Sequence, residues 1–116
     1  MVSVTYWREY LPHKSIGYHL KAEGHADYKL KDDIVCASVS TLFYTLANYL
    51  EQIGADDLVG TDEEDFLIEC KAMFQDDAVH TAFRMTVFGL SLIQEQYPDN
   101  VSVTEIADET DRGAEI

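Results

Sequence analysis

The chain has 116 residues, enough for one domain with a modest hydrophobic core. Its formal net charge of -14 at pH 7 argues against direct binding to nucleic acid, because phosphate binding needs clustered lysine and arginine. It has neither a basic, apolar leader nor an apolar run of about 18 residues, so we expect a cytoplasmic protein that binds no membrane.

The charge is unevenly distributed, and cysteines are few. Residues 1–31 hold five of the eight basic residues but only three of the 22 acidic ones, so the rest of the chain is strongly acidic. Such a chain suits a basic partner, because opposite potentials speed encounter. Cys36 and Cys70 lack the spacing of a disulfide framework, which favours free thiols in a reducing compartment.

Alternating polarity predicts two strands at the start of the chain. Apolar and polar residues alternate over residues 2–6 and again over residues 18–23, on either side of the turn-forming stretch LPHKSIG. We expect these strands to pair as a hairpin. Gly24 ends the second strand, which leaves His25 at a strand terminus beside a loop.

The most regular pattern predicts a helix over residues 34–53, with apolar residues recurring at spacings of three and four. Asp32 or Asp33 is expected to be the N-cap, its carboxylate accepting the free N–H groups of the first turn. Cys36 then falls in the first turn, and Ser40 lies on the same face one turn later.

The second half of the chain predicts an acidic loop, a strand, a helix and a last strand. Residues 56–65 contain six acids and read as a solvated loop without the spacing of a calcium site. Alternation over residues 66–74 predicts a strand whose inner face includes Cys70, a small core hydrophobe. The second helix should begin at Asp76 or Asp77 and end before Pro98. A strand over residues 101–106 completes the set.

These elements predict one α+β domain over residues 1–106. Two main helices would pack on a mostly antiparallel sheet of about four strands, in the order strand-strand-helix-strand-helix-strand. Residues 107–116 are acidic and free of aromatic side chains, so we expect a frayed tail.

The stretch GHADYKLKDDIVCASVS, residues 24–40, places His25 eleven positions before Cys36. A loop of this length allows a histidine and a thiol to approach, and the positive end of a helix dipole favours a thiolate. Asp32 and Asp33 oppose the thiolate unless they point away to cap the helix. A surface histidine and a packed cysteine also satisfy the spacing, so spacing alone leaves both readings open.

Metal binding is disfavoured, since His25 and Cys36 supply two ligands and no second close pair accompanies them. We expect no metal and no cofactor. His13, His19 and His80 occupy turn or polar-face positions, where exposure to solvent is the usual outcome.

The segments GHAD and DIVCASVS are together more specific than their spacing. They resemble the ribosomal-processing cysteine protease family, Prp, most densely over residues 24–40. The resemblance implies a catalytic dyad of His25 and Cys36. The supporting positions that it implies are Gly24, Ala26, Asp33, Ala37 and Ser40.

The resemblance also implies a substrate and an assembly. Members of the family remove the N-terminal extension of a large-subunit ribosomal protein, and related phage enzymes cut scaffold or capsid proteins. They are homodimers with a mobile loop between the histidine and the cysteine. Here that loop is about one residue shorter and lacks the usual glycine before DIVC. We expect residues 27–32 to become ordered around the substrate.

The chemistry that follows is acyl transfer. The Cys36 thiolate attacks the scissile carbonyl, His25 acts as general base and then acid, and N–H groups at the start of the helix at Ile34 are candidate oxyanion donors. A non-catalytic acidic protein that binds a basic ribosomal partner is the alternative. A redox-sensing thiol is a third reading, which needs a resolving cysteine near Cys36.

Overall fold

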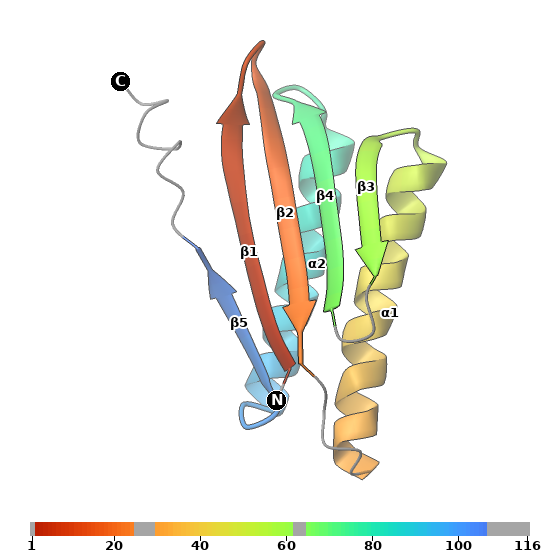
Figure 1. Cartoon of the computed structure of the whole chain (residues 1–116), viewed down its shortest axis with the longest axis vertical. Helices are drawn as coiled ribbons and strands as arrows, with labels where there is room; N and C mark the ends of the chain where they lie inside the picture. Colours follow the sequence, from red (N-terminus) through yellow and green to blue (C-terminus); the bar gives the residue numbers. More distant parts are fainter. Residues whose placement is uncertain (1, 25–29, 62–64, 107–116) are drawn as a thin grey trace.

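The structure is a computed structural model that describes residues 2–24, 30–61 and 65–106. The elements in chain order are β1 (Val2–Leu11), β2 (Ser15–Glu23), α1 (Leu30–Gln52), β3 (Asp56–Thr61), β4 (Asp65–Met73), α2 (Asp77–Gln96) and β5 (Val101–Glu105). The strands form one sheet in the order β3-β4-β2-β1-β5. Both helices lie behind this sheet in Figure 1, with α1 toward β3 and α2 crossing from behind β4 at its start to β1 and β5 at its end.

The hydrophobic core lies between the helices and one face of the sheet. Alternate strand residues such as Val4, Leu20 and Ile68 are fully buried, and they pack with Phe43 of α1 and Leu90 of α2. The period of two in the strands and of three to four in the helices turns these apolar side chains toward one another. The α+β class and the mostly antiparallel sheet are therefore confirmed.

The sheet differs from the prediction in having a fifth strand. The acidic stretch that was expected to be a loop contains β3, which pairs antiparallel with β4 over residues 56–61. The sheet is also mixed, because β5 runs parallel to β1 while the other neighbouring strands are antiparallel. The order of the other elements is as predicted.

The first hairpin is longer than its alternating pattern indicated. Residues Ser15–Gly17, expected to belong to the turn, are part of β2, and the turn itself is Pro12–Lys14. His13 and Lys14 carry the left-handed backbone angles of this turn, with φ of 64° and 55°. The extra pairing carries β1 as far as Leu11.

Helix α2 begins where the sequence predicted, whereas helix α1 begins earlier. Asp76 caps α2 as expected, its carboxylate accepting from the Val79 N–H at 3.5 Å. Helix α1 instead begins at Leu30, so Asp32 and Asp33 lie inside the helix and neither is its N-cap. Within the described ranges, no helix is long and apolar enough to cross a membrane.

Candidate active site

Cys36 lies near the end of the molecule where β2 finishes and α1 begins. In Figure 1 this is the lower end, where β3 also finishes and β4 starts. The Cys36 side chain is partly buried against the hydrophobic core, and it is a free thiol. Two positions before it, Ile34 is 56 % exposed. The thiol therefore sits at the boundary between core and solvent.

Gly24 gives the chain its direction as it leaves β2. It is exposed and has φ of 86°, in the left-handed region that favours glycine over residues with a Cβ. This backbone angle turns the chain toward the segment that precedes α1. The backbone angle at position 24 therefore favours glycine there.

The partner of Cys36 in the predicted dyad, His25, lies outside the described residues, as does Ala26. The predicted loop over residues 27–32 overlaps with α1, because Leu30 to Asp32 already have helical backbone. The segment that joins β2 to the helix therefore comprises residues 25–29 after Gly24.

The early helix start also corrects the position of Cys36, which lies in the second turn of α1 and not the first. The effect of a helix dipole is strongest within the first turn, and Cys36 lies beyond that turn. The N–H groups left without helical partners are those of residues 30–33. The N–H groups from Ile34 onward, which were the candidate oxyanion donors, lie within the helix.

Ser40 lies one turn beyond Cys36 and is partly buried. Neighbouring hydroxyls, those of Ser38 and Thr41, donate to helix carbonyls one turn earlier, at 2.9 and 2.7 Å. Within the described part of the chain, the Ser40 hydroxyl makes no such bond. Ala37 is exposed beside Cys36.

The other cysteine and the remaining histidines take structural positions. Cys70 is 3 % exposed in the core, as predicted, and His13 is exposed in the first turn. His80 was expected to be exposed, but its Nδ1 lies 2.5 Å from the Tyr18 hydroxyl and its Nε2 faces the carbonyls of Met73 and Phe74. Carbonyl oxygens only accept, so Nε2 carries a hydrogen.

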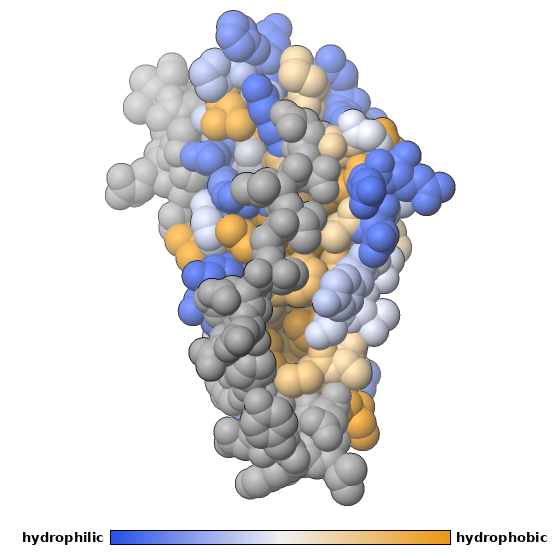
Figure 2. Space-filling model, turned by 45° about the vertical axis from the view of Figure 1, so that its right-hand side comes forward, coloured by the Kyte–Doolittle hydropathy of each residue, from blue (hydrophilic) through white to orange (hydrophobic). Residues whose placement is uncertain are grey.

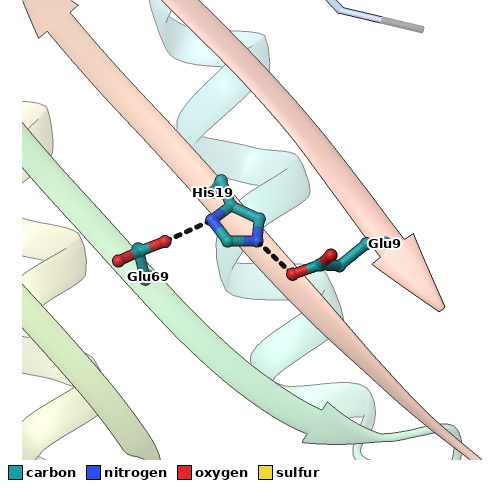
Figure 3. A network of polar contacts seen from close by, with 3 residues as sticks. All are labelled: Glu9, His19 and Glu69. Carbon is teal, nitrogen blue, oxygen red and sulfur yellow. Dashed lines mark hydrogen bonds and ion pairs between the residues drawn. The ribbon is translucent and has the colours of Figure 1, made fainter. Parts of the chain in front are cut away.

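His19 also departs from the prediction, because it is nearly enclosed on the open face of the sheet. Figure 3 shows its ring between the carboxylates of Glu9 and Glu69, at 2.9 and 2.5 Å. The side chain is 13 % exposed, and Trp7 stacks on the ring with centroids 4.8 Å apart. The contact of the buried Nδ1 with Glu69 is an ion-pair contact without good hydrogen-bond geometry.

Comparison of the chain with models of known protein families identifies its family. The family model described as cysteine protease Prp matches residues 1–102. This range includes the whole segment from Gly24 to Ser40. A comparison with curated proteins found no match.

Solved structures share the fold. The ribosomal processing protease Prp from S. aureus, in complex with a substrate peptide, superposes with a TM-score of 0.75 at 19 % identity, covering 91 % of this chain and 100 % of that one. SMU.848 from Streptococcus mutans gives a TM-score of 0.70 at 22 % identity, covering 93 % and 96 %. At identities this low, the superpositions establish that the fold is shared and no more.

Proposed function

Because the chain belongs to the Prp family of cysteine proteases, we propose that Cys36 is its nucleophile and His25 its general base. The match over residues 1–102 carries the proposal, since it includes both residues. It favours a protease over a non-catalytic acidic binding protein. The partial burial of Cys36 supports the assignment, because a nucleophile at the edge of the core can meet a substrate.

The reaction has two halves. The Cys36 thiol passes its proton to His25, and the thiolate attacks the scissile carbonyl to form a tetrahedral intermediate. His25 then donates the proton to the departing amine, and water hydrolyses the resulting thioester. Gly24 sets the backbone direction before His25, while Asp33, Ala37 and Ser40 support the dyad from α1. Ala26 belongs to the same segment as His25.

Two matched variants test the nucleophile. Cys36→Ala should abolish peptide cleavage and keep the fold, because the thiol is only partly buried. Cys70→Ala removes a thiol from the core and should retain cleavage. Cleavage is followed by mass spectrometry and folding by circular dichroism. Peptide hydrolysis by the Cys36→Ala variant at the same rate as the parent would refute the assignment.

We propose that the substrate is a large-subunit ribosomal protein precursor that carries an N-terminal extension. A named ribosomal processing protease shares the fold, and the net charge of -14 suits a basic substrate. Such a substrate would place the enzyme in the cytoplasm. Peptides that span the extension site, and peptides from phage scaffold or capsid sites, distinguish the two substrates that the resemblance implies.

We also propose a homodimer, formed through the outer face of the two helices. Tyr49 of α1 and Met85 of α2 are 44 % and 70 % exposed and border an apolar cavity of 510 Å³ between the helices. A two-fold contact would cover this face in both copies at once. Figure 2, which brings the α1 and β3 side forward, shows hydrophobic residues at the surface on that side and hydrophilic residues gathered at the upper end, while the outer face of α2 is largely turned away.

Sedimentation tests the dimer. The parent protein should sediment at twice the 13.1 kDa chain mass. Met85→Lys should shift it toward the monomer, because a charge would be buried in the contact. Thr104→Lys, at an exposed position on β5, adds the same charge elsewhere and should leave the dimer intact. A monomer at high micromolar concentration of the parent would contradict the proposal.

A further inference from the structure

A second cavity lies at the edge of the fold away from α1, between α2 and the β1 side of the sheet. It opens between β1 and α2, where β5 ends at Glu105, and has a volume of 410 Å³. Its walls are mainly aromatic and basic. We call it the arginine pocket, defined by Tyr6, Arg8, Tyr18, Arg84, Phe88 and Glu105.

The pocket exists because β5 is shorter than its neighbour. β5 pairs with β1 over Val2 to Tyr6, whereas β1 continues to Leu11. Even-numbered residues of β1 face the helices, as the full burial of Val4 shows, so Tyr6 and Arg8 point toward α2. Beyond the last pair, the space between β1 and α2 is filled by no strand in the described part of the chain.

Two arginines converge on the pocket from different elements, Arg8 from β1 and Arg84 from α2. Burial raises the pKa of Tyr18, while the positive charges of Arg8 and Arg84 act in the opposite direction, so both guanidinium groups lie near the phenol. The chain has only eight basic residues and 22 acidic ones, so two arginines at one pocket stand out from the mostly acidic composition. Glu105 at the rim offsets one of the two charges.

The rest of the lining suits a flat apolar group. Tyr18 stacks on Phe83 with centroids 4.7 Å apart, and Phe88 is 66 % exposed at the pocket, an unusual exposure for a large apolar ring. Pockets for small molecules are typically about 300–1,000 Å³, mostly apolar, with a few polar groups that fix orientation. Guanidinium groups bind carboxylates through paired, charge-assisted hydrogen bonds.

We propose that the arginine pocket is a binding site for a carboxylate attached to an aromatic or similarly flat apolar body, separate from the catalytic site. The carboxylate lies between Arg8 and Arg84, and the apolar body lies against Tyr6 and Phe88. This goes beyond the proposed proteolysis and does not depend on it, because Cys36 is on α1 and the pocket is on α2 and β1.

The carboxylate has two possible sources, a free small molecule or the acidic residues of this chain that follow β5. Ile106 is bonded through its N–H to the Tyr6 carbonyl, and Asp108 and Glu109 come directly afterwards in the sequence. Both sources present the same group to the same arginines. Replacing these two acids by amides in the full chain distinguishes them.

The test uses 2-naphthoate as the probe and 2-naphthamide as its neutral counterpart, titrated into the full-length protein and followed by amide chemical shifts. Naphthoate should shift residues around Arg84 and Phe88 and bind at least about tenfold more tightly than the amide, as expected for a charge-assisted contact. Arg84→Gln should weaken naphthoate binding by a similar factor. Lys71→Gln removes an exposed positive charge from β4, outside the pocket, and should leave binding unchanged.

Further variants separate the outcomes. Cys36→Ala should bind naphthoate like the parent, so loss of binding in that variant would assign the probe to the catalytic site and overturn the proposal. Equal binding of naphthoate and naphthamide, or an unchanged affinity in Arg84→Gln, would also overturn it. Tighter naphthoate binding by the Asp108→Asn, Glu109→Gln variant supports the proposal and identifies the chain's own acids as competitors. Unchanged affinity in that variant supports a free ligand.

Discussion

Single residues that sequence patterns assign to solvent can hold a sheet face together. His19 lies at the centre of three strands, because its pairing register places Trp7 beside it on β1 and Glu69 beside it on β4. The two ring nitrogens of His19 face carboxylates on different strands, Nε2 toward Glu9 and Nδ1 toward Glu69. The alternation that assigned His19 to the polar face was correct. The exposure was wrong, because enclosure depends on neighbours from other strands.

Replacing His19 should therefore cost stability. His19→Ala removes the stack with Trp7 and leaves Glu9 and Glu69 without their shared partner, so we expect a loss of about 1–2 kcal/mol in the free energy of unfolding. Urea denaturation at neutral pH measures it. His13→Ala, in the exposed turn, should stay within about 0.5 kcal/mol of the parent. Equal losses in the two variants would contradict the structural role of His19.

Tyr18 predicts how stability changes in alkali. Burial raises its pKa, so the folded protein holds the phenol proton more tightly than the unfolded chain does. Its contribution is fully present below the usual tyrosine pKa of about 10 and is lost as the pH rises through the higher folded-state pKa. Part of the decline in unfolding free energy above pH 10 should thus come from Tyr18.

The variant Tyr18→Phe separates this contribution from the others. At pH 7 it should be less stable than the parent by about 1 kcal/mol, because the bond to His80 is lost. Between pH 9 and 11 its stability should fall less steeply, so the difference between the two proteins narrows. A constant difference across this range would refute the assignment.

At the scale of elements, the two helices meet at a glycine. A Cβ on Gly89 of α2 would lie 3.1 Å from Cδ1 of Leu42 on α1, closer than ordinary contact. Gly89→Ala should change stability little, because the gain in helix propensity of up to about 1 kcal/mol offsets the crowding of a flexible side chain. Gly89→Leu should destabilise by about 1–3 kcal/mol, since the helices must separate.

A second substitution tests the cause of that loss. Leu42→Ala opens space opposite residue 89, so combining it with Gly89→Leu should cost less than the sum of the single variants. Thermal or urea unfolding of all three variants gives the coupling. Strict additivity would show that Gly89 acts through its own helix and not through contact with Leu42.

The elements that the sequence predicted well are those with a long apolar pattern. Both helices and the strands around Leu20 and Ile68 bury a continuous row of side chains, and period alone identifies such rows. β3 was missed because its residues are rich in aspartate, and its strand conformation depends on pairing with β4. The start of α1 was missed because aspartates favour caps by propensity, whereas here they lie within the first helical turn.

The site shows the same division. The roles of Cys36 and Gly24 stay predictions from the short segment that carries the family resemblance; the structure gives the partial burial of Cys36 and the left-handed backbone angle of Gly24. The arginine pocket could not be predicted, because Arg8 and Arg84 are 76 positions apart in the sequence. Only the packing of α2 against β1 beyond the end of β5 brings them together.

At the scale of the whole molecule, the charge of -14 should set the rate at which a basic substrate is found. Opposite long-range potentials raise the association rate, and salt screens them over a Debye length of about 10 Å at 0.1 M ionic strength. We therefore expect kcat/KM for a basic extension peptide to fall severalfold, on the order of threefold to tenfold, between 50 and 300 mM salt. The effect should lie in association, so kcat should change little.

A matched pair of peptides checks that the substrate's charge is responsible. A peptide with the same cleavage site, whose flanking lysines and arginines are replaced by glutamine, has no opposite charge to be attracted, so its kcat/KM should be low already at 50 mM salt and nearly independent of salt. The two peptides should converge at high salt, where screening removes the advantage of the basic one. If both lose activity in parallel, salt acts on the enzyme and not on encounter, and the acidic surface has no role in substrate capture.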